Sequence, residues 1–245
     1  MDVYWLEQSE ADLPAQNQWL STRERESLSR MRFAKRHNDW RLGRWTAKHA
    51  TAACLGFPHD LCALANLEIL AGPSGAPEVF LSNKIAPVAI SISHRSGVAM
   101  CAVALSADCV GCDVELIEPR SDAFTADYFT ANERTMVETT SVEEQPLLVT
   151  LLWSAKESAL KALHMGLRLD TKSLDVSVIE ELSPYIATAR HLPSVAGPLS
   201  SDDWHPLLVR YSDSQVFYGW WRQANHLVRT IVSALPLRPP IHSAS

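Results

Sequence analysis

The segment GVAMCAVAL, residues 97–105, constrains the fold more than any other part of the chain because it is apolar on both faces. A strand with this pattern lies in the centre of a sheet, covered from both sides. The alternating segment VAISISH, residues 88–94, precedes it across the turn-forming HRSG, which predicts an antiparallel hairpin. We expect VGCDVELI, residues 110–117, to be the third strand of the same meander.

The remaining patterns predict strands and helices in alternation. We expect a short strand at 3–7, a helix from Ser21 to Leu55, two strands around the AGPSGAP loop, a helix over 146–163, and strands at 174–180, 205–211, 214–223 and 226–235. This order predicts an α+β fold with two similar halves related by a pseudo-two-fold axis. Each half is expected to hold a small, mainly antiparallel sheet packed with helices. The expected parts are 1–107, 108–235 and a loose tail at 236–245.

Charge and composition exclude several classes of protein. The 245 residues carry a net charge of −6, which argues against a general nucleic-acid binder. No apolar run reaches the ~18–20 residues of a membrane span, and the first residues show no signal-peptide pattern. The 5 cysteines are scattered among apolar neighbours, as is typical of reduced thiols in a cytoplasmic protein.

Two acids at the end of the predicted meander form the first candidate site. Asp113 and Glu115 are two positions apart, so they share one face of the strand at a separation of about 6.6 Å. Cys112 and Val114 point to the opposite face, toward the core. Because the preceding strand is apolar on both faces, we expect this strand to be at least half covered. Either the acids meet solvent at a sheet edge, or they bind one cation, which would remove their repulsion.

The segment WSAKESALK, residues 153–161, is the second candidate. Ser154, Glu157 and Lys161 are spaced to share one stripe of the predicted helix, away from the apolar stripe. The alternative is a Glu–Lys pair on a solvated helix face, which would contribute a few tenths of a kcal/mol.

Two further segments, SISH and YFTANE, have both structural and functional readings. Ser93 and His94 end a predicted strand, where they either cap a turn or contact a phosphate. Neither a hydrolase elbow nor a Walker loop is present in the sequence. In YFTANE, Thr130 is the expected N-cap and Glu133 completes a capping box, which is an adequate structural role for that acid.

Taken together and in this order, SISH, GCDVE, FTANE and WSAKESALK resemble the 4′-phosphopantetheinyl transferases. The resemblance is greatest to the larger, monomeric, surfactin-synthetase-activating type. It extends roughly from Ser21 to Leu235 and includes the basic stretch RFAKRHNDWRLGRWTAK.

The resemblance implies transfer of the phosphopantetheine arm of coenzyme A to a serine of an apo acyl or peptidyl carrier protein. It implies Mg²⁺, with Mn²⁺ as an alternative, held by Asp113, Glu115 and Glu157. Asp113, Lys161 and Glu133 are the implied catalytic residues, with Glu133 as the general base proposed in some members. The implied coenzyme A-binding residues are Arg36, Arg41, Arg44, Lys48, Ser93, His94, Lys156 and Lys161. Arg41 is the first candidate for the 3′-phosphate.

One departure from the family pattern concerns the loop before SISH. Family members usually have a lysine where this chain has Ala76, so either another basic residue such as Lys84 substitutes or coenzyme A binds more weakly. The implied carrier brings an acidic surface that would face the basic helix. Two other readings stay open: a metal-dependent phosphodiesterase or nuclease using the same acids, and a non-catalytic protein that binds carriers or coenzyme A.

Overall fold

A computed structural model describes residues 1–105, 109–165, 168–179, 204–211 and 215–243. The N-terminal half is built on a four-stranded sheet with the order β12-β1-β6-β5. Its strands are β1 (Val3–Ser9), β5 (Ala89–Arg95), β6 (Val98–Ala104) and the late β12 (Ile241–His242). All neighbours are antiparallel except β1 and β12. The long helix α2 (Ala34–Leu55) packs on this sheet.

A three-stranded sheet completes this half, with the order β2-β3-β4. Its strands are β2 (Leu67–Ala71), β3 (Pro77–Leu81) and β4 (Lys84–Ile85). The short helices of this half are η1 (Glu10–Asp12), α1 (Thr22–Ser29) and α3 (Leu61–Asn66). Ser21 caps α1 in a capping box with Glu24, because both orphan N–H groups at the helix start then find acceptors.

The C-terminal half is built on a five-stranded antiparallel sheet with the order β7-β11-β10-β9-β8. Its strands are β7 (Val110–Leu116), β8 (Leu174–Val178), β9 (His205–Tyr211), β10 (Gln215–Ala224) and β11 (Leu227–Ser233). Its helices are α4 (Asp122–Tyr128), α5 (Ala131–Thr139), α6 (Gln145–Ala162) and η3 (Thr171–Ser173). Helix α6 packs on β7 and β11.

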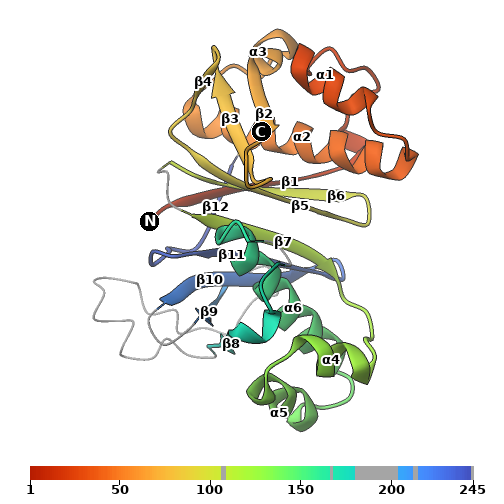
Figure 1. Ribbon diagram of the computed structural model, residues 1–245, viewed down its shortest axis with the longest axis vertical. Helices are drawn as coiled ribbons and strands as arrows, with labels where there is room; N and C mark the ends of the chain where they lie inside the picture. Colours follow the sequence, from red (N-terminus) through yellow and green to blue (C-terminus); the bar gives the residue numbers. More distant parts are fainter. Residues whose placement is uncertain (106–108, 166–167, 180–203, 212–214, 244–245) are drawn as a thin grey trace.

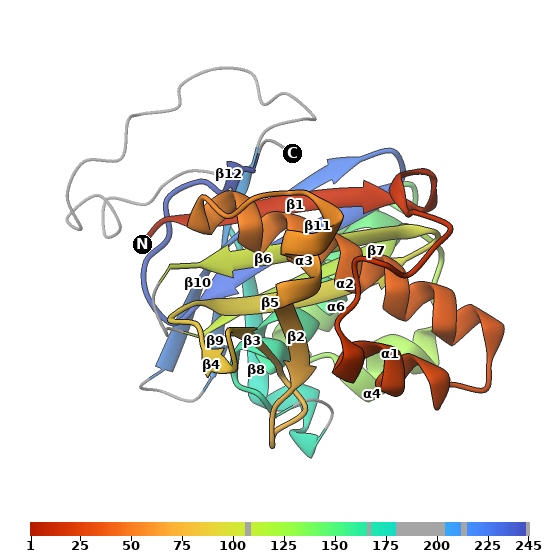
Figure 2. The same cartoon turned by 90° about the horizontal axis from the view of Figure 1, so that it is seen from above.

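The two main sheets lie against each other in the middle of the molecule, with α2 outside one and α6 outside the other (Figures 1 and 2). Buried residues of β1, β6, β7, β10 and β11 form one hydrophobic cluster between the sheets. Strand β6 is therefore apolar on both faces because α2 covers one face and the second sheet covers the other. The α+β class expected from the sequence, with small antiparallel sheets packed with helices, is confirmed.

The prediction that residues 88–117 form one three-stranded meander is wrong for its third strand. The hairpin β5–β6 forms as expected, but β7 pairs with β11 and belongs to the other sheet. Strand β5 meets β7 across the interface through side chains: the Cys112 N–H donates to Ser91 Oγ over 2.9 Å. The alternating serines Ser91 and Ser93 therefore face the opposite half of the molecule.

The structure differs from two other expectations as well. The helix expected from Ser21 to Leu55 is divided into α1 and α2, since Met31 turns into the core and Phe33 adopts an extended conformation before α2. In the segment expected to be a loose tail, β12 pairs with β1 and Leu237 is buried, so residues 237–243 are held in place. The expected strand at 174–180 is observed as Leu174–Val178, and residue 180 lies outside the described residues.

Candidate functional site

The acids of GCDVE lie where α6 crosses β7. Asp113 is 4% exposed and Glu115 is half-buried, whereas Cys112 and Val114 are buried on the opposite face of the strand. Gly111 allows the helix to approach, because a Cβ at this position would overlap the carbonyl oxygen of Ser158 on α6. The glycine of this segment therefore brings the helix and the strand close together.

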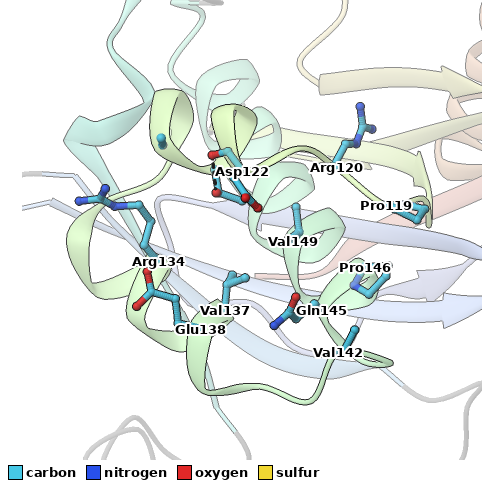
Figure 3. Close-up of a pocket in the computed structure, with 12 residues that line it drawn as sticks. Pro119, Arg120, Asp122, Arg134, Val137, Glu138, Val142, Gln145, Pro146 and Val149 are labelled. Atoms are coloured by element: carbon cyan, nitrogen blue, oxygen red, sulfur yellow. Dashed lines mark hydrogen bonds between the residues drawn. The ribbon is translucent and has the colours of Figure 1, made fainter.

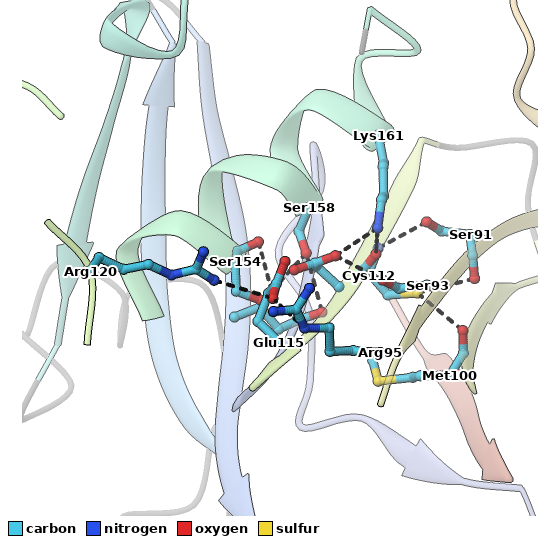
Figure 4. Close-up of polar contacts among 12 residues, drawn as sticks. Ser91, Ser93, Arg95, Met100, Cys112, Glu115, Arg120, Ser154, Ser158 and Lys161 are labelled. Atoms are coloured by element: carbon cyan, nitrogen blue, oxygen red, sulfur yellow. Dashed lines mark hydrogen bonds and ion pairs between the residues drawn. The ribbon is translucent and has the colours of Figure 1, made fainter. Parts of the chain in front are cut away.

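Asp113 has one engaged and one unengaged carboxylate oxygen. Ser93 Oγ donates to Asp113 Oδ1 over 2.8 Å, and Lys161 Nζ donates to the same oxygen over 2.8 Å. Asp113 Oδ2 is buried and has no hydrogen-bond partner among the described residues. Figure 4 shows Lys161 reaching from α6 toward β7, with Ser93 on the neighbouring strand. A buried carboxylate oxygen without a donor is costly, so an additional cationic partner would be stabilising there.

Glu115 lies between two guanidinium groups. Arg95 Nε is 3.4 Å and an Arg120 nitrogen is 3.7 Å from Glu115 Oε2. Both arginines also contact Glu118, at 2.8 and 3.0 Å (the pairs around Glu115 are drawn in Figure 4). Trp153 of α6 lies beside Glu115. Burial raises the pKa of Glu115, and the Asp113 carboxylate adds to the effect.

Glu157 brings a third carboxylate to this region from α6. Burial raises its pKa, followed by repulsion from Asp113 and from Glu115. Burial is the largest effect on the Lys161 amine and acts to lower its pKa, but Asp113, Cys112 and Glu157 together outweigh it, so the pKa is raised above its usual value. The three implied metal ligands therefore lie near enough to repel one another.

These carboxylates suit a hard divalent cation, which prefers oxygen ligands and needs compensating negative charge. The unpartnered Asp113 Oδ2 and the raised pKa of Glu157 both fit such an ion. Within the part of the chain that the structure describes, however, no three His, Cys, Asp or Glu side chains converge as a ready metal-ligand set. The residues fit the ion in chemistry and charge, and the ligand geometry is not preformed.

A pocket of about 620 Å³ lies between α2, β5 and the loop before β3. It brings together three of the implied coenzyme-binding residues, Arg36, Arg44 and His94, and Gly75 lies beside them. Lys35 and His94 also line an adjoining cavity. Lys84, the suggested substitute for the missing loop lysine, is on β4 and is not a lining residue of the 620 Å³ pocket.

Two basic residues of α2 are engaged elsewhere, in contrast to the expectation from the sequence. Arg41 donates to Asn17 Oδ1 over 2.8 Å and to the Pro14 carbonyl, so it ties α2 to the preceding loop. Lys48 is fully buried and lies 2.7 Å from Glu24. Its amine also donates to the carbonyls of Leu64 and Leu67, so all its donors are used inside the protein.

Glu133 and Lys156 form a buried pair away from solvent. Each is 0% exposed, and Lys156 Nζ is 2.8 Å from Glu133 Oε2. Glu133 accepts from the Thr130 N–H in the expected capping box, which is confirmed, and from the Val176 N–H. Lys156 donates to the carbonyls of Thr171 and Leu174. Neither side chain keeps a free group for a substrate.

Two serines also differ from their predicted positions. Ser154, expected on the stripe of Glu157 and Lys161, is fully buried and lies 2.9 Å from Thr230 Oγ1 on β11. Ser93 faces β7 and is 8% exposed, whereas the neighbouring His94 is exposed and lines the pocket between α2 and β5. Adjacent residues of a strand point to opposite faces, so SISH serves two different places.

Sequence reasoning missed the residues that complete this region. Arg95 and Arg120 contact Glu115, and Phe33, Lys35, Asp39 and Trp40 line the pocket between α2 and β5. The helical period offered a signal for the second group, because positions 36, 40 and 44 follow one stripe while Arg41 does not. No comparable local signal marks Arg120, whose role depends on the packing of the chain after β7.

A further pocket of about 620 Å³ opens between α4, α5 and α6 (Figure 3). Arg120 lines it and also contacts Glu115, so this pocket adjoins the acidic region. Its rim carries both charges, from Arg134 and Glu138, and the exposed Val142.

Comparison with known proteins adds one finding. Residues 109–209 match the family model of the 4′-phosphopantetheinyl transferase superfamily. The matched part contains Asp113, Glu115, Glu157 and Lys161. No curated protein matches the chain. Among the described residues, no helix has the length and apolar character needed to cross a membrane.

Proposed function

We propose that this protein transfers the 4′-phosphopantetheine group of coenzyme A to a serine of an apo carrier protein, giving the holo carrier and adenosine 3′,5′-bisphosphate. The family match over residues 109–209 supports phosphopantetheinyl transferase activity in general. The observation that carries the finer proposal is Asp113, which lies beside Glu115 and Glu157 with one buried oxygen still unpartnered.

Coenzyme A is proposed to bind along α2 and β5. Arg36 and Arg44 line one wall of the pocket and His94 lines another, so the nucleotide phosphates would meet cationic and hydrogen-bonding groups. Lys48 is left out of these contacts because all three of its donors are used inside the protein, and Arg41 is left out because its guanidinium holds the loop before α1. The diphosphate would then extend toward β7, where Lys161 lies.

The proposed reaction forms a bond between the carrier serine oxygen and the β-phosphorus of coenzyme A, and breaks the bond to the bridging oxygen that leaves with the nucleotide. The serine proton would be released to water. When bound, Mg²⁺ or Mn²⁺ would neutralise the charge that develops on the leaving phosphate. Asp113, Glu115 and Glu157 would hold the ion, and Lys161 would both orient Asp113 and face the phosphates. Glu133 is proposed to support the fold instead of taking the serine proton, since both its oxygens are engaged.

The same proposal extends to the oligomeric state of the enzyme, the side on which the carrier approaches and the cellular location. Because one chain supplies both β5 and β7, the site needs no second copy, which supports the larger monomeric type. The carrier is proposed to approach on the side of Arg120 and the pocket of Figure 3, next to Glu115. The free cysteines support a reducing, cytoplasmic location.

The test incubates the protein with coenzyme A, Mg²⁺ and a panel of apo carriers from fatty acid, polyketide, nonribosomal peptide and lysine biosynthesis. Intact mass of each carrier is then measured. We expect at least one carrier to gain the mass of phosphopantetheine, and no gain with a metal chelator. A panel that stays entirely apo would reject the proposal. Hydrolysis of a phosphodiester substrate by the same acids would favour the phosphodiesterase reading instead.

A further inference from the structure

We propose that Ser93 is a positioning residue for the cation site, orienting Asp113 across the boundary between the two halves. This inference rests on the proposed function because it assumes a divalent cation at Asp113. It assigns Ser93 a role different from the coenzyme contact that the family resemblance implies. The observation behind it is the hydrogen bond from Ser93 Oγ to Asp113 Oδ1.

The bond joins two strands that share no backbone pairing. Ser93 is on β5 of the four-stranded sheet, and Asp113 is on β7 of the five-stranded sheet. Both side chains are buried, at 8% and 4% exposure, so the bond forms in a region that excludes most water. A hydrogen bond to a charged group in such surroundings is stronger than one at the surface.

The geometry determines which carboxylate oxygen remains for an ion. Ser93 and Lys161 approach Asp113 from different elements, and both donate to Oδ1 at 2.8 Å. Two donors on one oxygen restrict rotation of the carboxylate, and Oδ2 is left buried without a hydrogen-bond partner in the described part of the chain. Outer groups that fix a ligand in this way commonly change metal affinity about 10–100-fold when they are removed.

Ser93 and His94 point to opposite faces of β5, toward the two parts of the proposed site. Ser93 faces β7, whereas His94 is on the other face of β5 and lines the coenzyme pocket. The strand therefore presents one residue to the cation side and the next residue to the nucleotide side. The Ser93 hydroxyl points toward β7 and does not line the pocket between α2 and β5. This argues against a direct contact between Ser93 and the nucleotide.

Ser91 provides a matched control on the same strand. It is also buried, at 4% exposure, and it also bonds β7, but its Oγ accepts from the Cys112 N–H and contacts no carboxylate. Removing either hydroxyl costs one contact between the halves. Only the loss of the Ser93 hydroxyl should release Asp113.

The experiment measures Mn²⁺ binding to the full chain by electron paramagnetic resonance, without coenzyme A or carrier. The variants are Ser93→Ala, Ser91→Ala and Ser93→Thr, and circular dichroism with thermal unfolding establishes that each is folded. We expect Ser93→Ala to weaken Mn²⁺ binding about tenfold. Ser91→Ala and Ser93→Thr should stay within about twofold of the parent, because one leaves Asp113 untouched and the other keeps the hydroxyl.

Equal Mn²⁺ affinity in the parent and Ser93→Ala would overturn the inference. An increased KM for coenzyme A in Ser93→Ala with unchanged Mn²⁺ binding would also overturn it, because Ser93 would then contact the coenzyme. If Ser93→Ala does not fold, weakened binding in Ser91→Ala or in Ser93→Thr would count against the assignment in the same way. A parent protein that binds no Mn²⁺ would remove the cation premise itself, and transfer measured separately would decide the proposed function.

Discussion

Helices α2 and α6 carry the same buried ion pair, yet only α6 contributes to the acidic site. Under α2, Lys48 pairs with Glu24 of a capping box and donates to two carbonyls before β2. Under α6, Lys156 pairs with Glu133 of a capping box and donates to two carbonyls before β8. In each half the glutamate also accepts a strand N–H, from Ile69 or from Val176.

The difference lies in the residues that follow each lysine. Glu157 and Lys161 follow Lys156 on α6, whereas His49 and Ala53 occupy the corresponding offsets from Lys48 on α2. The buried ion pair that both helices share therefore anchors each helix to its sheet. Glu157 and Lys161, which α6 alone carries, belong to the proposed site. Lys156 and Glu133 both lie in segments that the family resemblance includes, but their contacts hold the helix to its sheet.

The largest effect is expected at Asp113, on the strand that α6 covers. Asp113→Ala should lower transfer to a carrier by about a thousandfold or more, because the proposed ion loses its best-held ligand. Glu118→Gln is the matched control, since Glu118 contacts the same arginines as Glu115 but does not contact Asp113. Intact-mass kinetics and circular dichroism provide the measurement. Full turnover in folded Asp113→Ala would remove this residue from the site.

The shared pair gives the second prediction. Glu24→Gln and Glu133→Gln should each lower the free energy of unfolding by about 3 kcal/mol, because each leaves a buried ammonium without its counter-charge. Urea unfolding of both variants checks this. We expect the folded Glu133→Gln protein to keep turnover within a fewfold of the parent. An unchanged unfolding free energy together with a hundredfold loss of turnover would instead make Glu133 catalytic.

Lys161 gives a smaller expected effect. Lys161→Met should lower turnover about tenfold to a hundredfold, since Asp113 Oδ1 loses one of its two donors and a cation near the phosphates is removed. Ala53→Ser, at the matching offset of α2, should leave turnover unchanged. Steady-state kinetics at saturating coenzyme A separates the two helices. Equal losses in both variants would contradict the comparison.

The smallest effect concerns His49, the residue that follows Lys48. Burial, with a contribution from His59, lowers the pKa of His49 to about 4. The unfolded chain takes up this proton near pH 6.5 and the folded chain does not, so this contribution to stability is present above pH 6.5 and is lost as the pH falls toward 4. Because the ring is only half-buried, we expect about 1 kcal/mol. Unfolding of His49→Gln over this range should show a flatter pH dependence than the parent.

Local patterns were sufficient to predict many elements but not their pairing. The hairpin β5–β6, the helix α6 and the capping box at Thr130 follow from periodicity and cap residues that lie close together in the sequence. The partner of β7 does not, because β11 lies more than a hundred residues later and local alternation carries no information on register between distant strands. The break after Arg30 was missed for the same reason, since Met31 is drawn into a core that forms by distant contacts.

The site was predictable to a similar extent. The shared face of Asp113 and Glu115 follows from strand alternation. Helical spacing singled out Glu157 and Lys161, and the family resemblance supplied the roles expected of them. The burial of Lys48, Glu133 and Lys156 could not be read from the sequence, because charged residues on amphipathic helices are exposed by default. The internal comparison of α2 with α6 supplies this distinction, since equivalent lysines are buried in both halves.

The most direct test of the account substitutes the residue after the buried lysine in each helix. Glu157→Gln and His49→Gln are incubated separately with coenzyme A, Mg²⁺ and a carrier that the parent protein modifies, and the carrier mass is followed over time. We predict that the carrier stays apo with Glu157→Gln and becomes holo at the parent rate with His49→Gln. Parent-like transfer by Glu157→Gln would contradict the assignment of α6 as the helix that completes the cation site.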